Sequence, residues 1–327
     1  MRRSTLIGTI ALAALLPLTL GFQGPAYAQQ PFPSRPIKFI VPYPPGASTD
    51  NVARAFAQEL SKELKTPVIV ENRPGAGTAI GVLALKSQPA DGYTLLFQTE
   101  GLFVSKLASP ELGYEFSDFE VIAPLAQTPF TLIVPAQNQI KTLDDLKARA
   151  TKRNNELDFG SLGLGANQYT VLSRILSQQL GVKPNMIPYK GGMEGLSAVM
   201  SGQIDAYLAT VSLAYQQKDN PKIHILAPTS VGSANPLLPD VKSFKELGIK
   251  DMVSYSLYGV VVRSDTPEAI KAQLKQVARR VSDSEEMKQI RRQIALEDFP
   301  GTLDEFNAGV RNNIQMLQAA YEQERRR

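Results

Sequence analysis

Four short glycine-containing segments, each between an apolar stretch and an amphipathic stretch, most constrain the fold of this chain. The apolar stretches have the length and composition of strands, and the stretches that follow repeat apolar residues at helical spacing. Repeated units of strand, glycine loop and helix predict an α/β fold. The four segments are "PPGASTD" (44–50), "RPGAGTA" (73–79), "SLGLGAN" (161–167) and "YKGGMEG" (189–195).

The units occur in two groups, and two extended segments lie between them. Residues 119–148 and 255–270 read as long extended stretches that cross from one group to the other. We therefore expect two α/β lobes, residues 29–130 with 236–327 and residues 131–235, joined by a hinge of two crossings. The helices after Pro267 are expected to return and cover the first lobe.

The apolar faces of two helices support this reading. The helix after residue 50 carries Val52, Ala53, Phe56, Ala57, Leu60 and Leu64 on one face, and the helix after residue 167 carries Val171, Leu172, Ile175, Leu176 and Leu180.

Helix starts are marked by capping residues and acids. Thr142 is expected to cap a helix with Asp144 and Asp145 in its first turn, and Glu285 with Glu286 to begin another. Thr266 is expected to cap a third helix, with Pro267 in its first position.

The first 28 residues have the pattern of a secretory signal peptide. Arg2 and Arg3 precede an uncharged apolar run, and Ala26-Tyr27-Ala28 supplies small residues for cleavage near Ala28. A retained membrane anchor is the alternative, but the run is short and contains Pro17. The chain has no cysteine, and export without disulfides suits a Gram-negative periplasm.

Several function classes are disfavoured by composition. The chain has 35 basic against 31 acidic residues, and two of the basic ones are in the leader, so we expect no nucleic-acid partner. Metal sites built on histidine or cysteine are excluded, because His224 is the only histidine. His224 alternates with apolar residues like a strand residue, and we expect it to be structural and not part of a catalytic triad.

A dinucleotide-binding enzyme is the best enzymatic alternative. Gly75, Gly77 and Gly81 follow a strand, and Glu100 ends the next one, where a ribose-binding acid would lie. Arg73 and Pro74, however, lengthen the turn, and the third glycine comes one residue late. We therefore expect no cofactor and no catalytic residue.

The glycine loops predict a binding site for a small anion. Ligands of open α/β sheets bind at the carboxyl ends of the strands, and the first N–H groups of a helix have no partner inside it. Two lobes with such edges facing each other would form a cleft suited to a carboxylate.

A series of motifs along the whole chain resembles the Bug family of periplasmic solute receptors. The motifs are "RPIKFIVPYPPGASTDNVAR", "VIVENRPGAGTAIG", "PADGYTLLF", "FGSLGLGANQY", "PYKGGMEGLSAVMSGQID" and "LPDVKSFKELG". Bug proteins are the extracytoplasmic receptors of tripartite tricarboxylate transporters. The resemblance implies a type II periplasmic binding protein with two α/β lobes, which holds a small organic acid in the cleft between them.

The resemblance also implies which residues bind the ligand. A carboxylate would be held by backbone and hydroxyl groups of Tyr43, Gly46, Ala47, Ser48, Thr49 and Asp50, facing Ser161, Gly163, Gly165, Ala166 and Asn167. Thr99, Glu100, Lys190, Asp205 and Thr210 complete the expected set. Asp205 could instead cap its turn, Lys190 could line the rim of the cleft, and Glu100 could face solvent.

The expected function is capture of a small carboxylated solute and its delivery to the membrane subunits of a tripartite transporter, by a monomer. A receptor that presents its ligand to a membrane signalling protein is the alternative. The chain departs from the family pattern at Ala47, Ala166, Asn167, Tyr169, Ala209 and Thr210, so the ligand itself is not predicted.

Overall fold

The computed structural model describes residues 31–325 apart from residues 47, 100, 163–166 and 231–233. The strands are β1 (Ile37–Val41), β2 (Val68–Asn72), β3 (Thr94–Gln98), β4 (Phe119–Pro135), β5 (Glu156–Leu162), β6 (Lys183–Tyr189), β7 (Ala206–Thr210), β8 (Ile223–Pro228), β9 (Ala234–Asn235), β10 (Leu238–Lys242) and β11 (Tyr255–Arg263). The α-helices are α1 (Ser48–Leu64), α2 (Ala79–Lys86), α3 (Gly101–Ala108), α4 (Leu143–Thr151), α5 (Gln168–Leu180), α6 (Gly192–Met200), α7 (Val211–Tyr215), α8 (Glu268–Ser282), α9 (Glu285–Gln293) and α10 (Leu303–Arg325). Short 3₁₀ turns are η1 (Ala76–Thr78), η2 (Phe116–Asp118) and η3 (Ala136–Asn138).

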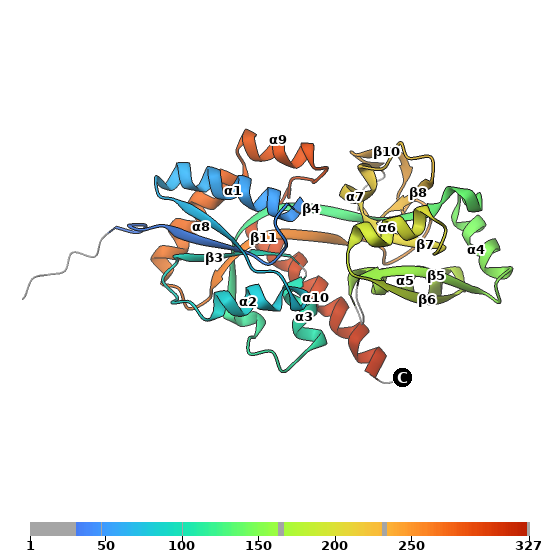
Figure 1. The fold of residues 1–327 in the computed structure, drawn as a ribbon, viewed down its shortest axis with the longest axis horizontal. Helices are drawn as coiled ribbons and strands as arrows, with labels where there is room; N and C mark the ends of the chain where they lie inside the picture. The colour runs from blue at the N-terminus through green and yellow to red at the C-terminus, as the bar shows by residue number, and fades with distance from the viewer. Residues whose placement is uncertain (1–30, 47, 100, 163–166, 231–233, 326–327) are drawn as a thin grey trace, which may run out of the picture. The chain divides into compact units, whose positions relative to one another are not determined.

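A nine-stranded sheet in the order β2-β1-β3-β11-β4-β7-β5-β6, with β8 also paired to β4, organises the described residues from Pro33 onward (Figure 1). In one half, β1 pairs in parallel with β2 and β3, and β11 lies antiparallel to β3. In the other half, β5 pairs in parallel with β6 and β7. The predicted order of strands, glycine loops and helices is confirmed in both halves.

The long strand β4 belongs to both halves of the sheet. Its residues up to Pro129 pair with β11, and those from Phe130 onward pair with β7 and β8. The chain returns to the first half between Ser254 and Tyr255, where β11 begins beside Pro129. Both predicted crossings are therefore present, and they lie side by side.

Each half has its own hydrophobic core. The core of the second half contains Phe130, Phe159, Leu172 and Tyr207, and also Phe244 and Met252. Residues 236–252 therefore pack with the second half, whereas the sequence reading assigned them to the first lobe. The reason is that β8 pairs with β4 in the second half of the sheet, and β10, which forms a separate two-stranded sheet with β9, packs against β8.

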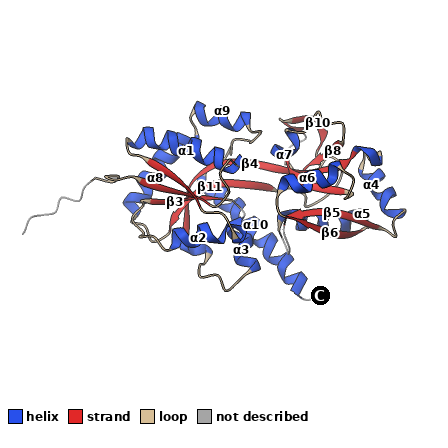
Figure 2. Ribbon diagram, in the orientation of Figure 1, coloured by secondary structure: helices blue, strands red, loops and turns tan. Residues whose placement is uncertain are grey.

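Helices cover both faces of the first half (Figure 2). On one face, α1 packs against α8 and α9, and Phe56 of α1 contacts Phe39 of β1 at a ring distance of 5.9 Å. On the other face, α3 packs against α2 and α10. The C-terminal helices thus return to the first half as predicted, and Leu317 of α10 also contacts Val171 of α5.

Two predicted helix starts are confirmed and one is shifted. Thr142 caps α4 in a capping box with Asp145, and Ser284 caps α9 ahead of Glu285 and Glu286. Pro267 is the N-cap of α8, not its first residue, because its extended backbone lets its carbonyl accept the Ile270 N–H at 2.9 Å.

Candidate functional site

The register of the sheet directs the carboxyl ends of both strand groups toward the crossing. In the first half, Gln98 at the end of β3 lies opposite Gly259, and β3 points from there toward Tyr255, which pairs with Pro129. In the second half, Thr210 at the end of β7 lies opposite Phe130. The glycine loops after β1 and β5 belong to these two edges, so the sheet brings the predicted binding loops toward one place.

The first loop, between β1 and α1, is organised by the buried side chain of Asp50. This carboxylate is 1% exposed and accepts hydrogen bonds from Gly46 N (2.8 Å), Arg54 Nε (2.8 Å) and Asn72 Nδ2 (2.7 Å). Gly46 has φ of +81°, a conformation that favours glycine. Asp50 therefore shapes the loop from within, whereas the sequence reading expected it to contact the ligand.

Asp50 remains ionised in this setting. Burial alone would raise its pKa, but the hydrogen bonds from Arg54, Asn72 and the Gly46 N–H, with the charge of Arg54, lower the pKa below its ordinary value. The positive charge of Arg54 also offsets the negative charge that Asp50 places in the first turn of α1. An anionic ligand at this helix start therefore does not meet an unpaired carboxylate.

Tyr43 and Thr99 join the loops after β1 and β3. The Tyr43 hydroxyl forms a hydrogen bond with Thr99 Oγ1, and the Tyr43 ring packs edge-on against Phe97, 6.4 Å between centroids. Asn72 Nδ2 also donates to the Tyr43 carbonyl at 3.0 Å. The structure thus brings together Tyr43, Thr99 and Asp50, three of the predicted site residues, at one edge of the sheet.

The second loop, between β5 and α5, is organised by neutral groups. Asn167 is the N-cap of α5: its Oδ1 accepts the Thr170 N–H at 3.1 Å, and its Nδ2 donates to the Leu162 carbonyl at 2.7 Å. Ser161 Oγ lies 2.8 Å from Thr170 Oγ1. Ser161 and Asn167 are 2% and 6% exposed, so the described part of this loop is stabilised by its own side chains.

Other predicted site residues lie in three different settings. Thr210 ends β7 and occupies the N-cap position of α7, at the same edge as Ser161. Lys190 is exposed, and its backbone N–H donates to Glu194 Oε2 at 2.8 Å in the loop before α6. Thr49 lies in the first turn of α1 and is partly exposed.

Asp205 is placed elsewhere by the structure. It lies before β7, at the opposite end of that strand from Thr210, and its side chain is 1% exposed. It forms ion pairs with Arg149 and Arg153 and accepts the Asp158 N–H at 2.9 Å. Its role is to connect α4 with β5 and β7, in place of the predicted contact with ligand.

Some predicted residues fall outside the described residues. These are Ala47, Glu100, Gly163, Gly165 and Ala166, and Ser48 is described only as the first residue of α1.

The glycines of the dinucleotide alternative have a structural use. The turn η1 separates β2 from α2, and α3 packs against it. Gly75 and Gly77 of this turn have φ of +121° and +60°, and a Cβ at Gly81 of α2 would lie 2.7 Å from Pro42 Cβ, so α2 and the segment after β1 approach too closely for a larger residue. His224 also has the expected structural role, because its Nδ1 donates to the Ile140 carbonyl at 2.8 Å.

Sequence reasoning missed four residues that position the loops. Arg54 lies one helical turn after Asp50, the spacing of a helical ion pair, and Asn72 ends β2 at the same edge. Gln168 donates from α5 to the Tyr255 carbonyl at 3.2 Å, and Thr229 Oγ1 accepts the Phe130 N–H at 2.9 Å while donating to the Ser254 carbonyl at 2.6 Å. The hydrogen bonds of Gln168 and Thr229 join segments that are distant in the sequence, so no local sequence pattern reveals them.

Among the described residues, no group of histidine, cysteine and acidic side chains could hold a metal ion. In the same part of the chain, no helix combines the length and the apolarity needed to cross a bilayer.

Two α/β halves, sharing one long strand and presenting strand-to-helix loops toward a double crossing, define the class of two-lobed solute-binding proteins. Comparison with known proteins agrees. The sequence profile of the tripartite tricarboxylate transporter family receptor matches residues 52–323. Protein BugT from Bordetella pertussis is 30% identical over 264 residues, which are 80% of this chain and 80% of that protein.

Two solved structures have a similar fold. The periplasmic binding protein BugD is 25% identical with a TM-score of 0.73, covering 89% of this chain and 98% of that one. A protein from R. palustris solved with adipate is 24% identical with a TM-score of 0.76, covering 89% and 97%. The chain belongs to the tripartite tricarboxylate transporter receptor family, and its predicted resemblance to Bug receptors is confirmed.

Proposed function

We propose that this protein is a periplasmic receptor that binds a small carboxylated solute between its two strand-to-helix loops and delivers it to the membrane subunits of a tripartite tricarboxylate transporter. The observation that carries the proposal is the register of the sheet, which directs both loops toward the crossing at Pro129 and Phe130. Membership of the receptor family supports the mode of action. The protein acts by binding alone, as a monomer and without catalysis.

We assign the N-terminal segment to export of the protein. Residues 1–28 serve as a signal peptide, and cleavage near Ala28 releases the receptor into the periplasm. BugD, which shares the fold, is a periplasmic binding protein. Residues 29–130 with the C-terminal helices form one lobe, and residues 131–235 with the segment through Met252 form the other.

Backbone donors at the two loops carry the recognition of the ligand. The side chains of Asp50 and Asn167 are engaged within their own loops, so they hold the starts of α1 and α5 in place instead of contacting the ligand. Helix starts with unpaired N–H groups favour an anion, and the pairing of Asp50 with Arg54 removes a source of repulsion. The R. palustris relative in fold was solved with the dicarboxylate adipate, which supports a carboxylate as the ligand here.

A thermal-shift screen of the purified protein tests this function. We would use monocarboxylates, dicarboxylates, amino acids and nicotinamide dinucleotides. A ligand that binds only the folded state stabilises it by RT ln(1 + [L]/Kd), about 2.7 kcal/mol at one hundred times Kd. Stabilisation by one class of small carboxylate supports the proposal. Stabilisation by a dinucleotide alone, or no response to any carboxylate, contradicts it.

A further inference from the structure

A cavity of about 410 Å³ lies in the first half of the protein, on the face of the sheet covered by α3 and α10. Its walls are mainly apolar and include Leu102, Phe103, Val121, Val261 and Val310. The volume is within the range of small-molecule sites, about 300–1,000 Å³. This cavity is separate from the loops after β1 and β5, because none of their described residues lines it.

Gln98 places a primary amide in this apolar surrounding. It is the last residue of β3, is 2% exposed and lines the cavity. Among the described residues, neither its Nε2 nor its Oε1 has a hydrogen-bond partner. An amide buried without a partner costs about 1–3 kcal/mol by mutational measures. A leucine at this position would avoid that cost, so the amide points to a function.

The register explains why this amide faces the cavity. Side chains alternate along a strand, and Leu96 of β3 belongs to the same core as Val121 and Val261. Gln98, two residues later, faces the same side. Gly259 lies opposite Gln98 on β11 and contributes no side chain to cover the amide. Phe97 faces the other side of the sheet, where it packs against Tyr43.

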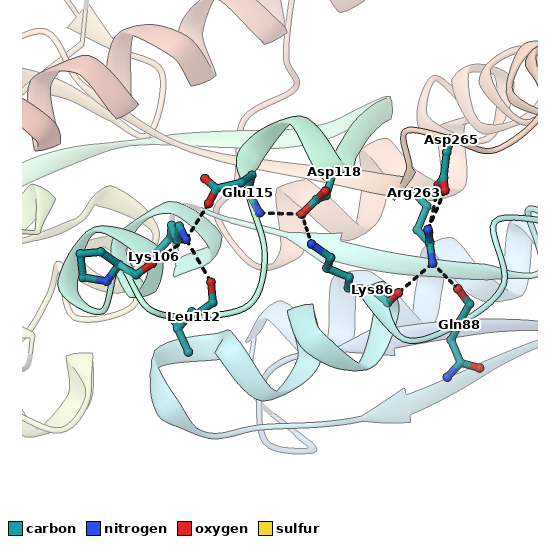
Figure 3. A network of polar contacts seen from close by, with 9 residues as sticks. Lys86, Gln88, Lys106, Leu112, Glu115, Asp118, Arg263 and Asp265 are labelled. Carbon is teal, nitrogen blue, oxygen red and sulfur yellow. Dashed lines mark hydrogen bonds and ion pairs between the residues drawn. The ribbon is translucent and has the colours of Figure 1, made fainter.

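The remaining wall of the cavity is built to hold its shape. Phe116 and Phe119 belong to η2 and the start of β4, and the ring of Phe116 packs edge-on against Phe103 at 5.3 Å. Figure 3 shows the polar network beside them: Lys86 Nζ donates to Asp118 at 2.6 Å, and Asp118 accepts the Glu115 N–H at 2.5 Å. Despite partial burial, these two hydrogen bonds hold the pKa of Asp118 below its ordinary value.

The same network connects this wall to the rest of the first half. Arg263, at the end of β11, donates to the carbonyls of Lys86 and Gln88, each at 2.8 Å, and Figure 3 shows it beside Asp265. Lys106 of α3 donates to the Leu112 carbonyl at 3.0 Å. Lys86 thus ties α2 to η2, Arg263 ties β11 to α2, and Lys106 ties α3 to the segment before η2, so these contacts stabilise the wall of the cavity at η2.

We infer that this cavity binds a second small molecule, a neutral carboxamide on an aromatic ring, whose amide pairs with Gln98. A primary amide offers two donors and two acceptor lone pairs, and another carboxamide complements both kinds of group at once. A carboxylate offers acceptors only and would leave Gln98 Oε1 without a donor. Two residues of opposite charge, Glu120 and Arg311, also line the cavity, so its walls offer an anion no net positive charge. The rings of Phe103 and Phe116 suit edge-to-face contact with an aromatic body.

Benzamide is the probe for this site, titrated into the purified protein by calorimetry or ligand-observed NMR. A fragment of about nine non-hydrogen atoms is expected to bind with a Kd on the order of 1 mM. Gln98→Leu is expected to weaken benzamide binding at least tenfold and to leave the melting temperature unchanged or higher, since the unpaired amide is removed. Gln276→Leu, the same change at an exposed position of α8, is the matched control.

Val310→Phe tests the site independently, because a ring in place of this wall residue occupies the cavity. It is also expected to weaken benzamide binding at least tenfold. Benzoate serves as the charged comparison and is expected to bind at least tenfold more weakly than benzamide, because its carboxylate has no donor for Gln98 Oε1. The inference is overturned if the wild-type protein does not bind benzamide, or if either folded variant binds it as the wild type does. These outcomes leave the carboxylate screen unaffected, so failure of one proposal is distinguishable from failure of the other.

Discussion

The two strand-to-helix loops have the same topology but are stabilised by different physical means. The loop before α1 is built around a buried carboxylate, Asp50, that is paired with Arg54 and hydrogen-bonded to Asn72. The loop before α5 is built around neutral groups, with Asn167 as the cap and the hydroxyls of Ser161 and Thr170 in contact. An anionic ligand between them would therefore meet one helix start beside a compensated ion pair and one without charge.

This difference indicates how two loops can share one anion. A carboxylate this close to the proposed site is tolerated because a guanidinium offsets its charge, and its charge-assisted hydrogen bonds stabilise the first loop. The second loop needs no such compensation. We therefore expect the first loop to be sensitive to charge and pH, and the second to be sensitive only to the loss of its cap.

The largest expected effect comes from removing the buried acid. Asp50→Ala removes the acceptor of the Gly46 N–H and one of the two acceptors of Asn72 Nδ2, leaves Arg54 without its carboxylate, and should destabilise the protein by about 3 kcal/mol. Urea unfolding measures the change. Asp144→Ala, which removes an exposed acid from the first turn of α4, is the control and should change stability by less than about 0.5 kcal/mol. Equal effects of the two changes would contradict the role given to Asp50.

A smaller loss is expected from removing the neutral cap of the second loop. Asn167→Ala deletes the acceptor of the Thr170 N–H and should cost about 1–2 kcal/mol. Asn167→Ser retains an acceptor oxygen and should recover most of that loss in the same unfolding experiment. If the serine variant is as unstable as the alanine variant, capping is not what Asn167 contributes.

These two residues also show how far the sequence could predict the site. Residue type and position were sufficient to place Asp50 and Asn167 at the correct helix starts, because glycine loops and apolar periodicity are local signals. Their roles were not predictable in the same way, since a polar side chain at a helix start can serve its own backbone as readily as a ligand. Arg54, a turn away, is the signal that would have favoured the first role for Asp50.

Contacts between distant segments were beyond the reach of local patterns. Asp205 was read from its turn alone, but its partners Arg149 and Arg153 lie in and after a helix more than fifty residues earlier. Residues 236–252 were assigned by chain order, and their packing with the second core depends on how β8 and β10 are placed. In both cases the role of the residues depends on contacts in the folded protein with segments distant in the sequence.

A charge change should separate ligand binding from stability in the first loop. Arg54→Gln leaves Asp50 in place but removes its compensating charge, so affinity for a carboxylate identified by the screen should fall about three- to tenfold, about 1 kcal/mol. The Arg54 side chain is 49% exposed, so unfolding should change by about 1 kcal/mol or less. Lys62→Gln, at the exposed far end of α1, is the matched control for a lost positive charge. Equal affinities of the two variants would show that compensation of Asp50 does not matter for the ligand.

The smallest effect is a difference between the loops in their response to acid. The pKa of Asp50 in the folded protein lies below its ordinary value, which is about 3.9 in an unfolded chain. Its contribution is therefore fully present above that unfolded pKa and is lost as pH falls through the folded one. The stability difference between the wild type and Asp50→Asn should thus shrink below about pH 4.

The difference between the wild type and Asn167→Ala should stay constant over the same range, because the asparagine does not titrate. Urea unfolding of the three proteins from pH 7 to pH 3 measures both differences, and a parallel decline of the two would show that the loops do not differ in the way their contacts indicate.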